Sequence, residues 1–255
     1  MKSEPRVTFY FPERERDILV EQHDFYVKEA KSRLLSQFSD IEAEADVKAE
    51  ETLERLAPTF NPDKHDEADF YELAQDKAIS HWMALDQLRS SVGLAVAAGM
   101  FHQFDKTLRD KVVRELSHCL EREFVEKVVW STDHPMLIEL LQWLGIALKE
   151  KSFSKQIDVL RLVINVYKHG DGGSHKKLSK QHPKFYEGSA VFAEFNIPPD
   201  FDKLTLSVED INRFAAAIKE FWHALPHRLY ENDMKQPPTW LDKKYEKYTL
   251  RKQRK

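Results

Sequence analysis

Apolar residues recur at intervals of three and four along most of this 255-residue chain, with polar residues between them. Such spacing is typical of amphipathic helices, because side chains three or four positions apart share one helix face. Residues 13–57 keep it without a glycine or a proline, which predicts one long helix, or two helices joined by a kink near Phe38–Asp40. The alternation expected of strands is nearly absent, so the pattern predicts an all-α protein.

Further helices are predicted where the same spacing returns. Ser131 to Pro135 has the form of a helix start, with polar capping residues followed by a proline at the first helical position. Ser207 and Asp210 have the spacing of a capping box at another start. We therefore expect a bundle of long antiparallel helices whose later members cover residues 65–98, 104–129, 136–149, 153–169 and 208–224.

Residues 170–204 interrupt the helical pattern. Three of the seven glycines of the chain fall at positions 170, 172 and 173, and prolines follow them. Long ordered loops in compact proteins are usually functional, and the aromatic content of this one favours order. The chain is therefore predicted to make an irregular, aromatic-rich excursion between the last two core helices, with rings at Phe185, Tyr186, Phe192, Phe195 and Phe201.

The helices and the excursion predict three segments. Residues 1–60 form a long N-terminal helix that packs on the rest or dimerises, residues 61–228 form the bundle core, and residues 229–255 form a basic tail. The tail interleaves lysines and arginines with Trp240 and Tyr245, residue types that hold RNA by phosphate contact and stacking. The alternative is that the tail is a solvated terminal segment, as most runs of charged residues are.

Composition narrows the classes of function. The chain is 42% hydrophobic and 32% charged, with a formal net charge of −4, so any nucleic-acid contact has to be a local patch. The single cysteine, Cys119, excludes an intramolecular disulfide framework. No apolar run reaches the roughly 18 residues that a membrane span needs, and the N-terminus lacks a signal-peptide core. We therefore expect a cytoplasmic protein without a membrane partner.

The helix predicted over residues 153–169 carries a polar stripe. Arg161, Asn165 and His169 follow one another at intervals of four, while apolar residues cover most of the remaining circumference. A helix that is apolar nearly all round is central in its bundle, so polar groups on it need partners. A guanidinium fork, an imidazole that titrates near neutrality and glycine-exposed amides together suit a site for phosphate groups.

The end of this helix has two interpretations. In the simpler one, Gly170 stops the helix, and Lys168 and His169 lie where the helix dipole favours cations. One glycine is enough for that, so the rest of the glycine-rich stretch is left unexplained. In the second interpretation the helix end binds a substrate, and the predicted binding residues are Lys168, Gly172, Gly173, Ser174, Lys176 and Lys177.

The stretch Asn165-x-x-Lys-His-Gly-x-Gly-x-Ser174, in an all-α chain with long helices, resembles the HEPN superfamily (higher eukaryotes and prokaryotes nucleotide-binding domains). Pro183-Lys-Phe185, which follows it, is similar to the corresponding stretch of bacterial members of that group. The resemblance covers about residues 65–225. It implies a protein that binds RNA or a nucleotide without a cofactor, and a homodimer.

Catalytic HEPN proteins cleave RNA without a metal, through an Arg and a His separated by about four to six residues. The resemblance therefore implies a metal-independent endoribonuclease acting as a bacterial toxin or phage-defence effector. Asn165 and His169 carry over directly, and Arg161 is a displaced candidate, because seven residues separate it from His169. In that role His169 moves a proton at the scissile phosphate, Arg161 and Lys168 neutralise charge, and Asn165 orients the phosphate or the imidazole.

Other chemistries are less well matched. His169, His175 and His182 recur without a cysteine or carboxylate at ligand spacing, so no metal site is predicted. Ser174 has no base and orienting partner for nucleophilic catalysis. The alternative function is a non-catalytic helical module that binds a protein partner through residues 170–204. The tryptophans are expected in the core rather than in a cofactor site, among them Trp82, Trp130, Trp143 and Trp222.

Overall fold

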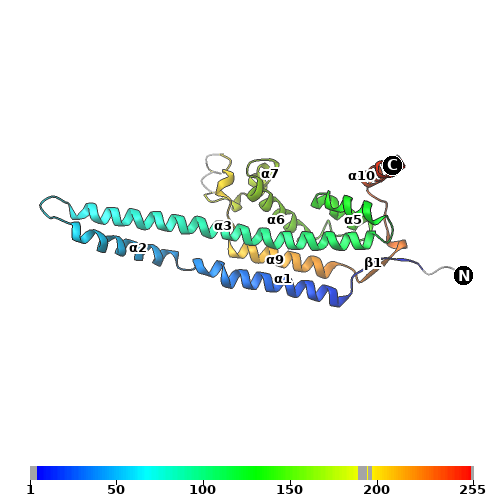
Figure 1. The fold of residues 1–255 in the computed structure, drawn as a ribbon, viewed down its shortest axis with the longest axis horizontal. Coiled ribbons are helices and arrows are strands. Elements are labelled where there is room, and N and C mark those ends of the chain that lie inside the picture. The colour runs from blue at the N-terminus through cyan, green and yellow to red at the C-terminus, as the bar shows by residue number, and fades with distance from the viewer. Residues whose placement is uncertain (1–4, 189–193, 195–196, 254–255) are drawn as a thin grey trace. The chain divides into compact units, whose positions relative to one another are not determined.

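The computed structural model describes residues 5–188, 194 and 197–253, and this part of the chain is mainly helical (Figure 1). The all-α class predicted from the spacing is therefore confirmed. In the described ranges the only sheet pairs two short antiparallel strands that the sequence did not predict, β1 (Val7–Tyr10) and β2 (Arg228–Tyr230). None of the described helices is both long and apolar enough to cross a membrane.

The N-terminal stretch 13–57 forms two helices, which confirms the kinked alternative. They are α1 (Glu13–Arg33) and α2 (Ile41–Leu56), and a 3₁₀ turn at Leu35–Phe38 separates them. A second 3₁₀ turn, Ala57–Thr59, follows α2 and contains Pro58, as the loss of the pattern there predicts.

The next two predicted helices are wrong in their boundaries. Instead of separate helices over 65–98 and 104–129, the chain forms one helix of 50 residues, α3 (Glu67–Leu116), followed by the short α4 (Arg122–Trp130). Gly99 does not end α3. A Cβ atom at this position would overlap the hydroxyl of Tyr26 on α1, so the glycine permits close packing of the two helices.

The following helix starts as predicted and ends early. In α5 (His134–Trp143) the Asp133 carboxylate accepts a hydrogen bond from the Met136 amide at 2.9 Å, which is a side-chain N-cap. The helix was expected to reach residue 149, but Gly145 adopts φ 98°, and a Cβ there would lie 2.6 Å from the Asp233 carbonyl oxygen. The left-handed turn at Gly145 therefore leads the chain away from the helix.

The last two predicted core helices are confirmed as α6 (Ser152–His169) and α9 (Val208–Ala224). At the start of α9, the Asp210 amide donates to the Ser207 hydroxyl at 3.1 Å, and the Ser207 amide donates back to the Asp210 carboxylate at 3.3 Å. These reciprocal bonds are the capping box that the sequence predicted.

The excursion between α6 and α9 is present but is not irregular throughout. Gly173–Gln181 form α7, and 3₁₀ turns cover Pro183–Phe185 and Phe201–Lys203. The expectation of an irregular loop is corrected here, because a short helix with few apolar residues gives little periodic signal. Phe192 and Phe195, two of the rings assigned to the excursion, lie outside the described residues.

The basic tail forms a helix, and most of its lysines and arginines are exposed. After β2 and a 3₁₀ turn at Glu231–Asp233, the chain forms α10 (Thr239–Lys252). The Trp240 indole donates to the Glu139 carboxylate at 2.6 Å, and Tyr245 meets the ring of Phe124 edge-on at a centroid distance of 5.0 Å. Interleaved aromatic residues in α10 therefore serve packing against α5 and α4.

The chain divides into two compact units, and neither is one continuous segment. The first unit comprises residues 1–26, 97–165 and 212–255, and the second comprises residues 27–96 and 166–211. Because the divisions fall inside elements, α1, α3, α6 and α9 each contribute residues to both units.

The core of the first unit is an aromatic cluster between helices. Phe104 of α3 meets Phe221 and Trp222 of α9 edge-on, at centroid distances of 5.0 and 5.4 Å. Lys111 is also buried here, between the rings of Phe9 and Phe11, and its ammonium group pairs with Glu115 at 2.8 Å. These contacts anchor the N-terminal strand on α3.

The core of the second unit joins α3 to the excursion. Tyr186 and Leu204 form a single antiparallel bridge and are both buried, and Ser90 of α3 donates to the Thr205 hydroxyl at 2.6 Å.

The first half of α3 leaves several large apolar side chains exposed, and one of them is Trp82, which was expected in the core. Exposed apolar residues of this half are Tyr71, Leu73, Ile79, Trp82, Met83 and Leu88. In the first unit Trp130 is half exposed, whereas Trp222 is buried as expected.

Candidate functional site

The predicted polar stripe lies on the last three turns of α6. Its apolar neighbours from Leu160 to Val166 are buried, as a central helix requires, but Tyr167 is 42% exposed, so the last turn emerges from the core. Arg161 is half-buried, and its Nε lies 3.4 Å from Asp158 Oδ1, one turn earlier. Asn165 is half-buried, and His169 is exposed.

The boundary between the compact units falls after Asn165. Arg161 and Asn165 therefore belong to the first unit, and His169 belongs to the second with all the predicted binding residues. A joint catalytic site of Arg161, Asn165 and His169 stays a prediction from the sequence.

The glycines after α6 differ in their roles. Gly170 adopts φ 66°, its amide donates to the Val166 carbonyl at 2.8 Å, and a Cβ there would lie 3.4 Å from the Phe201 ring. Gly170 is thus a left-handed helix stop, as the simpler interpretation holds. Gly172 is the N-cap of α7 and Gly173 its first residue, and a Cβ at either position would meet nothing within 4 Å. Packing therefore does not require glycine at positions 172 and 173.

Helix α7 has one buried and one cationic face. His175 and Leu178 are buried, and His175 Nδ1 lies 2.9 Å from the hydroxyl of Tyr186, whose pKa burial raises to about 12. A phenol with so high a pKa stays protonated at neutral pH, and the tautomer of the imidazole decides which of the two groups donates. Lys176 and Lys177 are exposed, so the two predicted lysines remain accessible.

Three lysines and a histidine therefore flank the turn between α6 and α7 within the second unit. Lys168 and His169 end α6, and Lys176 and Lys177 lie in the first turns of α7; all four are exposed. Gly172 provides no side-chain cap, so α7 begins without a carboxylate or hydroxyl from its own N-cap residue. A helix N-terminus of this kind attracts anions, and lysines nearby add to the attraction.

The second unit also contains a large groove, of about 1730 Å³ with the part open to solvent included. Its walls come from α3, the last turn of α6 and the segment 201–205, and none of the predicted catalytic or binding residues lines it. The sequence signal that could have revealed this groove is the large number of apolar residues on α3, more than one buried face needs. Residues of the groove include Trp82, Met83, Ser90, Tyr167, Gly170 and Phe201.

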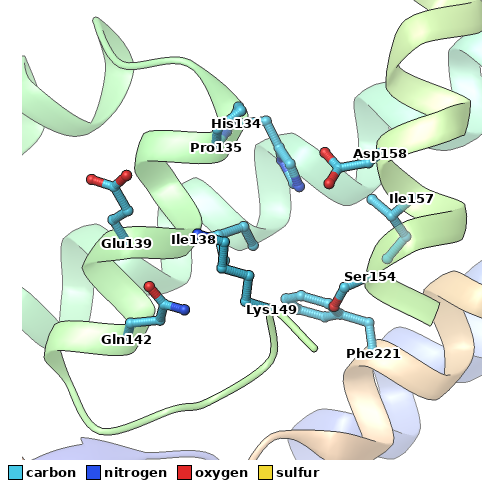
Figure 2. A pocket seen from close by; sticks show the side chains of 10 residues that line it. All are labelled: His134, Pro135, Ile138, Glu139, Gln142, Lys149, Ser154, Ile157, Asp158 and Phe221. Atoms are coloured by element: carbon cyan, nitrogen blue, oxygen red, sulfur yellow. The ribbon is translucent and has the colours of Figure 1, made fainter. Parts of the chain in front are cut away.

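A smaller pocket in the first unit contains a buried histidine (Figure 2). Sequence reasoning treated His134 only as part of a helix start, since its partner Asp105 is 29 positions away. Burial acts to raise the pKa of the Asp105 carboxyl, but hydrogen bonds from His134 and Arg109 outweigh it, and the net pKa is lowered. Asp105 therefore stays ionised at neutral pH beside the imidazole.

No group of three or more histidine, cysteine, aspartate or glutamate side chains in the described part of the chain is placed to hold a metal ion. Comparison of the chain with family models, with curated proteins and with solved structures gives no match.

Proposed function

We propose that this chain is an HEPN-like protein that binds RNA or a nucleotide at the end of α6 and the start of α7. The observation that carries the proposal is the set of exposed basic side chains, Lys168, His169, Lys176 and Lys177, around a turn whose second helix begins without a side-chain cap. Phosphate groups suit this arrangement, because lysines neutralise their charge and helix amides donate hydrogen bonds to their oxygens.

Glycine at positions 172 and 173 supports the same proposal. Since no neighbouring atom occupies the space of a Cβ there, the two positions leave the backbone of the turn accessible from outside. Accessible backbone amides are what a phosphate site uses, as in other glycine-rich anion sites. The simpler helix-stop interpretation accounts for Gly170 and leaves Gly172 and Gly173 to this role.

The enzymatic form of the proposal is a metal-independent endoribonuclease that acts as a bacterial toxin or phage-defence effector. His169 is exposed and so accessible to an RNA strand, where it would transfer the proton of the 2′-hydroxyl or of the leaving oxygen. Lys168 would neutralise developing charge. Arg161 would first have to leave its ion pair with Asp158.

Expression of wild-type protein beside His169→Ala tests this enzymatic form. We expect wild-type induction to arrest growth and fragment cellular RNA, and His169→Ala to abolish both at an unchanged helical content. His118→Ala is the matched control, since His118 is an exposed histidine on another part of the chain. If the purified wild-type protein cleaves no RNA and arrests no host, the ribonuclease proposal is wrong.

A second function, a non-catalytic module for a protein partner, is favoured by the groove of the second unit. Apolar side chains of the groove are exposed at Trp82, Met83 and Phe201, which is typical of a protein-binding surface. In this case Met83→Glu would remove the biological effect of the protein while His169→Ala would leave it unchanged. The opposite pair of results would favour the RNA site.

A further inference from the structure

The pocket of the first unit lies between α5 and the first turns of α6, with Phe221 of α9 at one side (Figure 2). Its volume is about 550 Å³, including the part open to solvent. Apolar walls come from Pro135, Ile138, Ile157 and Phe221. The other six lining residues are polar or charged: His134, Glu139, Gln142, Lys149, Ser154 and Asp158.

His134 is held in one orientation at this pocket. Its Nδ1 lies 3.0 Å from Asp105 Oδ1, and the Arg109 Nε donates to the same carboxylate at 2.6 Å. Arg109 is fixed in turn by the carbonyls of Val129 and Thr132, at 2.5 and 2.8 Å. Because an ionised carboxylate only accepts, Nδ1 of His134 donates, and in the neutral imidazole Nε2 carries the lone pair.

The imidazole ring of His134 faces the pocket. The His134 side chain is only 5% exposed, and its Nε2 has no hydrogen-bond partner within the described part of the chain. Figure 2 shows the ring pointing from α5 toward the Asp158 carboxylate on α6. Glu139, Gln142 and Lys149 lie away from this pair, and Glu139 already accepts from Trp240 at 2.6 Å. A ligand or water in the pocket can therefore donate a hydrogen bond to Nε2 when the imidazole is neutral.

We propose that this pocket binds a small organic amine, as a primary ammonium group on a short apolar chain. When the imidazole is neutral, two acceptors, His134 Nε2 and the Asp158 carboxylate, face the same space, and an ammonium group brings three donors and a positive charge to them. Asp158 keeps acceptor capacity beside its contact with Arg161, because a carboxylate has about four lone-pair sites. The apolar walls then contact the alkyl chain. The proposal concerns the first unit alone and does not depend on RNA binding.

Titration with n-butylamine at pH 8, followed by calorimetry and by the ¹⁵N shift of His134 Nε2, tests the proposal. We expect saturable binding on the order of millimolar, a shift of the Nε2 resonance, and no binding of 1-butanol, which lacks the charge. Asp158→Asn and His134→Gln should each weaken binding about tenfold or more. Asp158 is exposed enough that its substitution leaves the fold intact, so it decides the test if His134→Gln unfolds the protein.

Glu139→Gln is the matched control, because Glu139 lines the same pocket but already has a partner. It should leave the affinity for butylamine unchanged. The proposal is overturned if wild-type protein shows no saturable binding, if Asp158→Asn binds as the wild type does, or if only Glu139→Gln loses binding.

Discussion

Substitution of the three glycines that follow α6 separates the requirements of the fold from those of binding. Gly170 has φ 66°, and left-handed backbone costs an alanine about 1–2 kcal/mol. The Cβ of an alanine there would be in ordinary contact with Phe201, at 3.4 Å, so strain and not overlap sets the cost. Gly170→Ala is therefore expected to lower the free energy of unfolding by about 1–2 kcal/mol.

Gly173→Ala is expected to act in the opposite direction. Position 173 is the first residue of α7, its Cβ would meet nothing within 4 Å, and alanine favours helix over glycine by up to about 1 kcal/mol. Gly172→Ala should change stability little, because its backbone is extended and its Cβ site is open. The expected spread between Gly170→Ala and Gly173→Ala is thus about 2 kcal/mol.

Urea unfolding followed by circular dichroism at 222 nm measures these differences, and RNA binding by fluorescence anisotropy is measured on the same samples. We expect Gly172→Ala and Gly173→Ala to be stable and yet to bind RNA more weakly than wild type. The structural reasoning is refuted if Gly173→Ala is as unstable as Gly170→Ala. The binding role of the glycines is refuted if both stable variants bind RNA as the wild type does.

Three further predictions concern the first unit. Lys111→Ala removes the nearest cation from the buried Glu115 carboxylate, which keeps Arg114 at 3.3 Å and the Tyr10 amide at 3.0 Å, so denaturant unfolding should show a loss of about 1–3 kcal/mol. Replacing both Lys111 and Glu115 by apolar residues should cost less than removing Lys111 alone. The lowered pKa of Asp105 stabilises the fold above its ordinary pKa of 3.8, and this contribution disappears as pH falls through the lowered value. Asp105→Asn should therefore flatten the acid limb of a stability–pH curve. Tyr245→Ala removes a ring contact with Phe124, and limited proteolysis should then release α10 at a protease concentration that leaves wild type intact.

Sequence periodicity was sufficient to predict the bounds of a helix where the residues that start and stop it lie within or next to the helix. The bounds of α6 and α9 were predicted because an apolar stripe, a glycine stop and a capping box all lie within the segment. The same local signals misled at Gly99, whose role depends on Tyr26 more than seventy positions away. Sheet pairing between Val7–Tyr10 and Arg228–Tyr230 has the same long-range origin and was missed.

The candidate sites, too, could be predicted only where their residues are close together in the sequence. The cationic turn after α6 was predicted because its residues are consecutive. The pocket at His134 was not predicted, because Asp105 on α3, which orients His134, and Asp158 on α6, which lines the same pocket, are distant from His134 in the sequence. The groove of the second unit was missed for the same reason, since its walls come from α3 and the excursion.

Binding of a labelled single-stranded RNA to Lys176→Glu/Lys177→Glu, measured by anisotropy at several salt concentrations, tests the central claim most directly. Loss of two phosphate contacts should weaken binding strongly and reduce the slope of log affinity against log salt by about 2. Lys243→Glu/Lys247→Glu is the control, with the same change of charge at exposed lysines of α10. The account predicts that only the first variant loses affinity and slope. Equal affinity and slope in the first variant and the wild type would contradict it.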